Sequence, residues 1–315
     1  MAGTVVFFTP RGNGRKPVVY FTLIYHKPRY IVMWGFCMQT LSLVIPAYNE
    51  EAHIARCLDA IARQTVPPDE VIVVNNNSTD RTVAITALYP FVRLVSEKRQ
   101  GIVYARNCGF NGARGSILGR IDADTILPAT WVQDVKQFYA DPDRAASALT
   151  GGCVPVNMHF PRAGSWLVGN VVYPIGRLLL GHYPLYGSNM ALPATAWQAV
   201  RRTTCVRGDI DEDIDLAIHL HRRGYEIVVS KQLIVGATIR RMRGEFGALW
   251  SGAKRWPRIL RTHHNRWWMV ALFESLLLVA SSVLVMGLDL IVWLSRGQPL
   301  PEWGGYREGA RHARN

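Results

Sequence analysis

A strand that ends in two carboxylates is encoded by Gly119-Arg-Ile-Asp-Ala-Asp-Thr-Ile-Leu-Pro128. Apolar residues lead to Ile121, Asp122 and Asp124 follow where the strand ends, and Pro128 starts the next helix. Residues two apart on a strand point to the same side, so we expect both carboxylates to face one site at the carboxyl end of the strand, where open α/β sheets bind ligands. Two close carboxylates favour a hard divalent cation with a phosphate ligand. The alternative is a pair of solvated turn aspartates.

Strands and helices alternate on both sides of this stretch. Such alternation predicts a doubly wound α/β sheet, and the uniformly apolar strands indicate that both of its faces are covered. Up to Asp124, strands are predicted at 41–47, 70–74, 93–96 and 116–121, and helices at 50–63, 78–88 and 101–113. Beyond Asp124, helices are predicted at 128–139 and 211–223, the second capped by Gly224, and strands at 148–156, 187–192 and 225–230.

The composition indicates one large domain with an appendage and an anionic partner. The chain has 315 residues, of which 49% are hydrophobic, and a formal net charge of +13. Such a charge suits phosphate groups, an acidic membrane surface or nucleic acid. The basic residues gather late in the chain, beside an apolar stretch, and no aromatic and basic recognition motif is present. We therefore expect no nucleic-acid partner.

The cysteines and histidines predict neither disulfides nor a zinc site. The five cysteines include no Cys-x-x-Cys pair, and their number is odd, as expected of a reduced domain that faces the cytosol. His219 and His221 lie in the helix predicted at 211–223, but side chains two apart on a helix diverge. These two histidines are therefore not expected to share a metal.

Two C-terminal segments predict contact with a membrane. Residues 244–262 have the pattern of an amphipathic helix with tryptophans on its apolar face and basic neighbours, which Pro257 is expected to kink or interrupt. We expect this helix to lie in the membrane interface; the alternative is a core-packed helix with a solvated basic face. The apolar segment that follows is long enough to cross a bilayer and has Trp267, Trp268 and Trp293 at its ends.

These features predict how the chain is divided into segments and on which side of the membrane the large domain lies. We expect an N-terminal extension at 1–38, with Met38 as the true start, an interfacial basic helix at 244–266, a transmembrane helix at 267–295 and a tail at 296–315. Arginines flank the amino-terminal side of the apolar segment, so the positive-inside rule leaves the large domain on the cytoplasmic side of the cell membrane. The alternative to a transmembrane helix is a soluble helical hairpin.

Six short motifs in order resemble glycosyltransferase family 2. The resemblance covers about residues 40–245 and implies the GT-A fold, a Rossmann-like, doubly wound mixed sheet at 39–243, with a nucleotide-binding half (39–125) and an acceptor half (126–243). It also implies transfer of a sugar, with inversion, from a nucleotide-diphosphate donor. The motifs are Val-Ile-Pro-Ala-Tyr-Asn-Glu-Glu at 44–51, Val-Val-Asn-Asn-Asn-Ser-Thr-Asp at 73–80, Ala-Arg-Asn-Cys-Gly at 105–109, Ile-Asp-Ala-Asp at 121–124, Gly-Ser-Asn-Met-Ala at 187–191 and Glu-Asp-Ile-Asp-Leu at 212–216.

The first two motifs would bind the nucleoside of the donor. Pro46 and Tyr48 would contact the base, and Glu50 would accept hydrogen bonds from base or ribose groups; alternatively, Glu50 is a carboxylate favoured at a helix start. Asn76 stands where the family often has an acid, and its amide can still accept a hydrogen bond. Asp80 would serve either the ligand or the first turn of its helix.

The next two motifs would hold the ribose, the diphosphate and its metal. The resemblance places Asp122 near the ribose and gives Asp124 the role of holding Mg²⁺ or Mn²⁺ on the diphosphate. It places Arg106 near the donor nucleotide, where a guanidinium binds phosphate oxygens in pairs. The alternative for Arg106 is a salt bridge to an aspartate at the sheet end.

The last two motifs would serve the acceptor. Inverting transfer needs a carboxylate that deprotonates the acceptor hydroxyl, and the resemblance gives that role to Asp213, with Glu212 as its catalytic neighbour. Neighbouring acids would raise the pKa of one member of this group; the alternative is a string of acids favoured at a helix start. Gly187 and Asn189 would lie on the acceptor side of the site.

Two departures from the family refine these expectations. Processive members carry Gln-x-x-Arg-Trp, but the stretch 252–256 lacks the glutamine, which indicates a single transfer. Residues 235–243 lack the histidine that many relatives have near the metal, so Arg240 or Arg241 would meet the diphosphate instead.

We therefore expect a membrane-anchored enzyme that uses a UDP- or GDP-sugar and a lipid-linked or membrane-proximal glycan acceptor. One alternative is a polyprenyl-phosphate sugar synthase, although Thr125-Ile-Leu-Pro128 lacks the polar continuation common in that group. The other alternative is an inactive membrane scaffold with the same fold.

Overall fold

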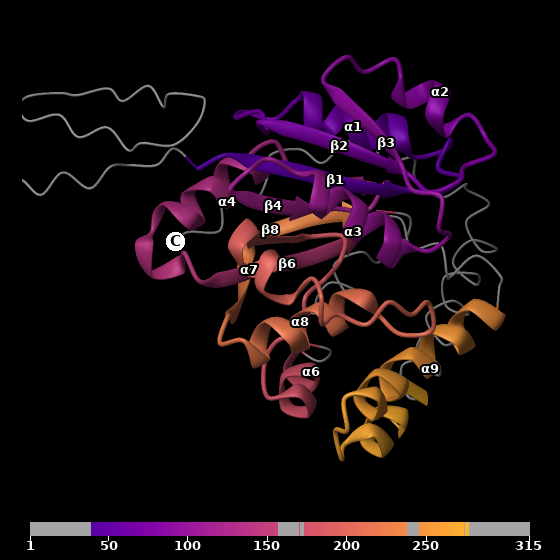
Figure 1. The fold of residues 1–315 in the computed structure, drawn as a ribbon, viewed down its shortest axis with the longest axis vertical. Helices are drawn as coiled ribbons and strands as arrows, with labels where there is room; N and C mark the ends of the chain where they lie inside the picture. The colour runs from indigo at the N-terminus through magenta and orange to yellow at the C-terminus, as the bar shows by residue number, and fades with distance from the viewer. Residues whose placement is uncertain (1–38, 157–169, 171–172, 238–245, 274, 277–315) are drawn as a thin grey trace, which may run out of the picture. The chain divides into compact units, whose positions relative to one another are not determined.

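A mixed β-sheet organises the protein in a computed structural model of the chain (Figure 1). The structure describes residues 39–156, 170, 173–237, 246–273 and 275–276. Among these residues the sheet has eight strands in the order β3-β2-β1-β4-β7-β6-β8-β5. The strands are β1 (Leu41–Ala47), β2 (Glu70–Asn75), β3 (Val92–Ser96), β4 (Ile117–Arg120), β5 (Thr125–Ile126), β6 (Ser147–Pro155), β7 (Met190–Pro193) and β8 (Glu226–Ala237).

Both parallel and antiparallel pairs occur in this sheet. β1 pairs with β2 on one side and with β4 on the other, and β3 extends β2, all in parallel. β7 runs antiparallel between β4 and β6. The doubly wound mixed sheet is therefore confirmed. The carboxyl ends of β1, β2 and β4 lie along one edge, and the chain segments that leave them begin at Tyr48, Asn76 and Ile121, so this edge gathers the donor motifs.

Helices cover both faces of the sheet. Along β1, Leu43 belongs to one hydrophobic core with Trp131 of α4, and Val44 belongs to a second core with Trp197 of α7. A Cβ at position 109 would lie 2.3 Å from Val44 Cγ1, so Gly109 lets α3 pack closely on the strand. The helices are α1 (Ile54–Ala62), α2 (Thr82–Thr86), α3 (Ile102–Gly112), α4 (Trp131–Ala140), α6 (Tyr173–Leu180), α7 (Ala194–Val200), α8 (Glu212–Arg222) and α9 (Phe246–Thr262), with a 3₁₀ turn at Pro142–Arg144.

Most predicted elements are present with shifted ends. α2 is much shorter than the helix predicted at 78–88, because the residues before it form a turn. β5 and α7 are not predicted by the apolar pattern. The predicted cap at Gly224 is confirmed: its φ is +84°, its N–H donates to His221 O at 2.9 Å, and Tyr225 N–H donates to Leu220 O at 3.1 Å. This pair of bonds is the Schellman arrangement, which favours glycine.

α9 packs on the protein through one face. The helix runs through Pro257 without a break, so of the two predicted effects of this proline, a kink or an interruption, the interruption does not occur. Ile259 lies in a small core with Ile218 of α8, and Leu260 lies in another with Leu179 of α6. The basic residues Lys254, Arg258 and Arg261 are exposed. For residues 254–262 the structure therefore favours the alternative of a core-packed helix with a solvated basic face. The helix continues through Pro257 because the burial of Ile259 and Leu260 outweighs the loss of the one backbone hydrogen bond that proline removes.

The predicted membrane-spanning helix is not part of the described fold. Across the described ranges, no helix combines the length and apolar character needed to cross a bilayer. Of the segment predicted at 267–295, only 267–273 and 275–276 are described. The predictions for 1–38, 240–243 and 296–315 also lie outside the described residues.

Candidate active site

The aspartate pair leaves the sheet edge in the alternating manner that the sequence predicts. Ile121, Ala123 and Thr125 are at most 1% exposed, whereas Asp122 and Asp124 between them are partly exposed. The turn is closed by Thr125 N–H, which donates to Asp122 O at 3.0 Å. The two carboxylates therefore alternate with buried residues in a turn directly after β4.

Arg120 is a buried cation at the end of β4, directly before this pair. Its guanidinium donates from Nη2 to Asp122 Oδ1 at 2.7 Å, and its Nη1 lies 2.9 Å from Glu212 Oε1. Burial alone would lower the pKa of Arg120, but Asp122 and Glu212 reverse that effect and raise it. A Cβ at position 187 would lie 1.6 Å from Nη1, so Gly187 leaves the space that this guanidinium occupies.

Glu212 lies between two buried arginines. Its Oε1 meets Arg120, and its Oε2 accepts from Arg106 Nη1 at 2.6 Å. Arg106 is fully buried, and burial lowers its pKa; its Nε and Nη2 donate to Asn107 Oδ1 at 3.1 and 2.9 Å. A continuous chain of ion pairs thus runs from Asp122 through Arg120 and Glu212 to Arg106.

This chain of ion pairs changes two predicted roles. Arg106 does not reach the donor side, because burial and its bonds to Glu212 and Asn107 fix its guanidinium inside the protein. The alternative of a structural salt bridge is favoured, with Glu212 as the partner in place of a sheet-end aspartate. Both oxygens of Glu212 are held by guanidinium groups, so we assign Glu212 a positioning role and not that of a base.

Asp213 is the carboxylate of α8 that faces the site. Gly187 N–H donates to its Oδ2 at 2.8 Å, and Ile214 N–H donates to its Oδ1 at 2.9 Å. Burial, followed by the charges of Glu212 and Asp211, raises its pKa from 3.8 to about 7. A carboxylate with a pKa near neutrality can take a proton from a hydroxyl group and still be ionised at physiological pH. The structure thus brings Gly187 and Asp213 together.

The loop after β1 presents Tyr48. This side chain is 49% exposed, although the loop itself is fixed. Asn49 adopts a left-handed backbone (φ +54°), and its Oδ1 accepts from Thr79 N–H at 2.8 Å. Glu50 is 8% exposed, and its N–H donates to Thr82 Oγ1 at 2.7 Å. A rigid loop with an exposed aromatic ring suits contact with a planar group.

Asp80 serves the first turn of its helix, which is the second of its two predicted roles. Its carboxylate accepts from Thr82 N–H at 2.9 Å and from Glu51 N–H at 3.0 Å. Burial opposes ionisation, but these bonds and that of the Thr82 hydroxyl lower the pKa of Asp80 overall. Asp80 therefore joins the start of α2 to the loop after β1.

Pro46, which was predicted to contact the base, lies buried within β1 opposite Val74.

Two predicted binding residues are used by the protein's own backbone. Asn76 is 3% exposed; it donates to Glu97 O at 2.9 Å and Arg99 O at 2.7 Å and accepts from Gly101 N–H at 2.7 Å. Asn76 thus holds the loop before α3.

Asn189 has no exposed surface, and its amide joins three elements. It donates to Gly152 O at 2.9 Å and Leu233 O at 2.8 Å and accepts from Trp131 Nε1 at 2.8 Å. We therefore assign Asn189 to the core rather than to the acceptor side, and Asn76 to a loop beside the donor edge.

The protein matches known families and structures over the region of this site. The family model "Glycosyl transferase family 2" matches residues 42–176, and "Glycosyl transferase family group 2" matches residues 120–299. The second match covers more than half of the chain. The protein belongs to glycosyltransferase family 2.

The relatives include a glycosyltransferase named AglE from Haloferax volcanii, 30% identical over 186 residues, which cover 55% of this chain and 54% of that protein. Validoxylamine A glucosyltransferase from Streptomyces hygroscopicus subsp. limoneus is 29% identical over 227 residues, or 61% of this chain and 50% of that protein. The match to a chondroitin synthase of Pasteurella multocida is 39% identical over 35% of this chain and 12% of that protein. The chain thus spans about half or less of the curated relatives that it matches.

Solved glycosyltransferases share the fold. A mannosyltransferase from Pyrobaculum calidifontis, solved with GDP-Man and Mn²⁺, has a TM-score of 0.57 at 20% identity, over 87% of this chain and 80% of that one. Glucosyl-3-phosphoglycerate synthase of M. tuberculosis has a TM-score of 0.52 at 20% identity, over 71% of this chain and 80% of that one. The described fold is therefore of the GT-A type.

Proposed function

We propose that this protein transfers a sugar from a nucleotide-diphosphate donor to a hydroxyl group of an acceptor, with inversion at the anomeric carbon. The observation that carries the proposal is Asp213. Its pKa of about 7 and its bond to Gly187 N–H suit a base, and the ion pairs through Arg120 fix it relative to the Asp122–Asp124 edge. The complex of the related mannosyltransferase fold with GDP-Man and Mn²⁺ supports the donor class.

The reaction needs one base and one leaving group. Asp213 takes the proton of the acceptor hydroxyl, the oxygen forms a bond to the anomeric carbon, and the bond from that carbon to the nucleotide diphosphate breaks. The electron pair leaves with the nucleotide diphosphate. A single displacement of this kind inverts the anomeric centre. Arg106, Arg120 and Glu212 hold the start of α8, so that Asp213 keeps its position through the reaction.

The donor edge fits a hard divalent cation. Asp124 would hold Mg²⁺ or Mn²⁺, which carboxylate oxygens suit. Soft sulfur ligands do not suit these hard cations, so the nearby thiols of Cys57 and Cys153 are not assigned to the metal. A bound metal neutralises negative charge on the leaving diphosphate.

The nucleoside end of the donor would lie at the first loop. We assign Tyr48 to stacking on the base and Asp122 to the ribose side, with UDP and GDP both compatible. Arg120 holds the carboxylate of Asp122 at 2.7 Å. A site with a base, a donor edge and a fixed connection between them argues against an inactive scaffold.

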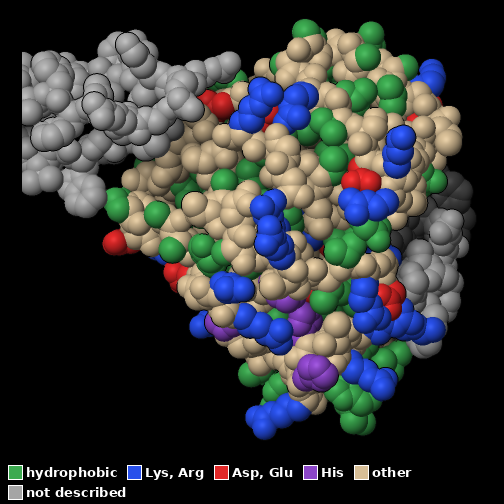
Figure 2. Space-filling model, viewed as in Figure 1, with side chains coloured by type: hydrophobic (Ala, Val, Ile, Leu, Met, Phe, Trp, Pro, Cys, Tyr) green, Lys and Arg blue, Asp and Glu red, His purple; other side chains and the backbone are tan. Residues whose placement is uncertain are grey.

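We further propose that the enzyme works at the cytoplasmic face of the cell membrane on a lipid-linked or membrane-proximal glycan. The described helical residues after α9 expose apolar side chains, and Figure 2 shows apolar beside basic side chains in the part of the molecule where α9 lies. Arg266 lies over the Trp267 ring, and Arg261 over the Trp268 ring. Apolar and cationic groups together favour an anionic lipid surface. The exposed apolar residues are Trp267, Met269, Val270, Leu272, Phe273 and Leu276.

Turnover of a donor panel tests the enzymatic proposal. Purified full-length protein is incubated with UDP-, GDP- and dTDP-sugars, with and without Mn²⁺, and released nucleoside diphosphate is measured. We expect metal-dependent release from one donor class and a loss of about 10²–10⁴-fold in Asp213→Asn. Asp209→Asn is the matched control, because Asp209 pairs with Arg207 outside the site at 2.7 Å. Undiminished turnover in Asp213→Asn would exclude Asp213 as the base.

A further inference from the structure

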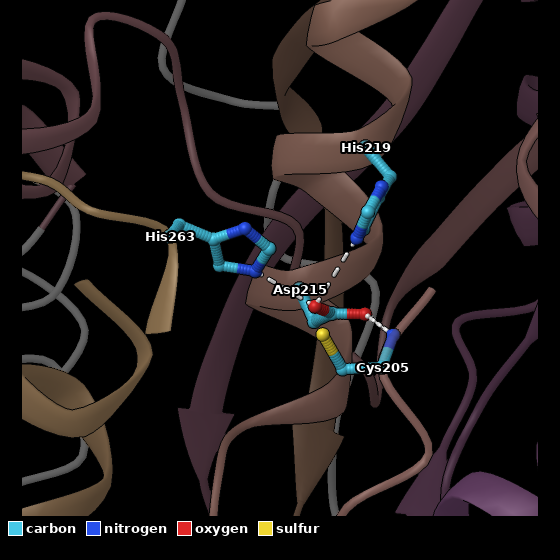
Figure 3. A group of neighbouring side chains, drawn as sticks. All are labelled: Cys205, Asp215, His219 and His263. Atoms are coloured by element: carbon cyan, nitrogen blue, oxygen red, sulfur yellow. Dashed lines mark hydrogen bonds and ion pairs between the residues drawn. The ribbon is translucent and has the colours of Figure 1, made fainter. Parts of the chain in front are cut away.

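A second group of chemically reactive side chains lies on α8, beyond the residues of the transfer site. It consists of Cys205 from the segment after α7, Asp215 and His219 from α8, and His263 directly after α9 (Figure 3). One ligand atom from each lies within 4.8 Å of those of the other three. Both imidazole rings and the thiol are turned toward the Asp215 carboxylate. This group is called the α8 cluster below.

The α8 cluster is closely packed and shielded from water. Asp215 has no exposed surface, and the side chains of His263 and His219 are 6% and 13% exposed. Asp215 Oδ1 lies 2.8 Å from His263 Nε2 and 3.6 Å from His219 Nε2. His219 Nε2 is buried and has no hydrogen-bond partner. The contact of this nitrogen with Asp215 Oδ1 is longer than a hydrogen bond, and an ion placed between the two would give both atoms a short bond.

We propose that the α8 cluster binds a zinc ion through Cys205 Sγ, a carboxylate oxygen of Asp215 and the Nε2 atoms of His219 and His263. Four ligands from sulfur, nitrogen and oxygen are the set that zinc takes in closed, tetrahedral sites. A thiolate and a carboxylate balance the two charges of the ion, so the complete site is neutral, as its buried position requires. The thiolate separates this site from the oxygen-only edge at Asp124, which suits Mg²⁺ or Mn²⁺.

Binding would change few contacts outside the cluster. The Cys205 thiol loses its proton to solvent as the sulfur–zinc bond forms. Coordination through Nε2 leaves the His263 proton on Nδ1, so Arg222 gives up its 3.1 Å contact with Nδ1 and keeps its 3.1 Å bond to His263 O. Arg222 is exposed, which makes this adjustment easy. Cys205 N–H donates to Asp215 Oδ2 at 2.8 Å and orients the carboxylate, as supporting bonds do at metal sites.

The ion would join α8 to the segment just before it and to the residue that follows α9, which is far from both in the sequence. The i, i+4 pair Asp215 and His219 lies on one face of α8, and Cys205 and His263 come from either side. The prediction of no zinc site rested on cysteine spacing and on His219 with His221, whereas the cluster uses partners that only the fold brings together. Zinc would thus tie α9 to the helix that carries Asp213.

Metal analysis and cobalt substitution test the proposal without any sugar donor. Full-length protein, purified without chelator, is expected to hold about one zinc per chain, and the cobalt form is expected to show a sulfur-to-cobalt charge-transfer band with the visible bands of a tetrahedral ion. Cys205→Ser should lose the charge-transfer band, and His219→Gln should lose most of the zinc. The matched controls Cys108→Ser and His221→Gln keep the thiol and histidine chemistry of the cluster intact and should retain both signals.

Three results would overturn it. One is wild-type protein that holds no zinc and gives no thiolate band with cobalt, which would leave the α8 cluster as a hydrogen-bonded group only. The second is zinc that remains at full stoichiometry in both Cys205→Ser and His219→Gln. The third is zinc that is lost in Asp124→Asn, which would place the ion at the donor edge. The wild-type cobalt spectrum decides even where a variant fails to fold, and failure of sugar transfer leaves the outcome unaffected.

Discussion

Replacement of the Asp213 carboxylate by an amide is expected to stabilise the protein while it removes turnover. The pKa of Asp213 rises from 3.8 to about 7 because burial and the neighbouring acids disfavour its charge. The folded pKa therefore lies above the unfolded one. The stability that the protonated form contributes is complete below about pH 4 and is lost as the pH rises to about 7. Asp213→Asn has no such charge at any pH.

The magnitude follows from the size of that rise. Each pKa unit corresponds to about 1.4 kcal/mol, so an ionised Asp213 at about pH 8 costs the folded state about 4 kcal/mol. Asp213 is partly exposed, and screening by solvent reduces the expected gain in Asp213→Asn to about 2 kcal/mol. For a domain of this size, that gain raises Tm by about 4–8 °C. The amide oxygen can still accept from Gly187 N–H, and the bond from Ile214 N–H is the one that the amide gives up.

Thermal unfolding of the two proteins at about pH 5 and about pH 8 measures this effect. The difference in Tm between Asp213→Asn and the wild type should grow toward the higher pH. Asp209→Asn is the control; it should show no gain, because the bonds from Arg207 lower the pKa of Asp209. A variant that is equally stable at both pH values, or less stable at the higher one, would refute the raised pKa. Retained turnover would refute the role of Asp213 as the base.

Three further changes test the rest of the site. In Arg120→Met the loss of a positive charge beside Asp213 should raise the pKa of the acid limb in the pH profile of kcat/KM by about one unit or more. Arg120→Lys should leave that pKa near the wild-type value. The same pKa in both variants would contradict an electrostatic effect of Arg120 on Asp213. Asp124→Asn should lower metal-dependent turnover at least about a hundredfold. Full activity at the wild-type Mn²⁺ requirement would remove Asp124 from the metal site. The double variant Phe273→Ser, Leu276→Ser should float less with vesicles that contain phosphatidylglycerol. The control Leu88→Ser, which changes an exposed leucine elsewhere on the surface, should float like the wild type. Equal flotation of the wild type, the double variant and the control would exclude the apolar residues after α9 as the membrane contact.

The sequence predicted the parts of the site that depend on local pattern. The predicted alternation holds for exposure: Asp122 and Asp124 are partly exposed, whereas Ala123 between them is buried. The order of strands and helices around them follows from apolar runs and helical spacing in the same way. The motif series correctly led to family 2 and to the GT-A type of sheet.

The sequence did not predict which polar side chains the protein uses internally. Asn76 and Asn189 stand in motifs that suggest binding, but the backbone groups that they contact come from other strands and loops. Arg120 was missed, although an arginine in an apolar strand is a signal that a buried charge needs partners. Those partners, Asp122 and Glu212, come from two different motifs. Only the paired strands and the position of α8 show that one guanidinium connects them.

α8 gives these observations a common physical basis. Its first turn carries Glu212, Asp213 and Asp215, and the next turns carry Ile218 and His219. One helix thus carries the base, two residues of the α8 cluster and Ile218, which packs against Ile259 of α9. Three acids in the first turn favour the helix start, yet repulsion from Glu212 and from Asp211, the residue before the helix, contributes to the raised pKa of Asp213. The ion pair of Glu212 with two buried arginines offsets part of that repulsion on one side. A zinc ion would leave the complete α8 cluster neutral, so the positive charge that acts on Asp213 is that of Arg120, which lowers the pKa of Asp213 against burial and the neighbouring acids.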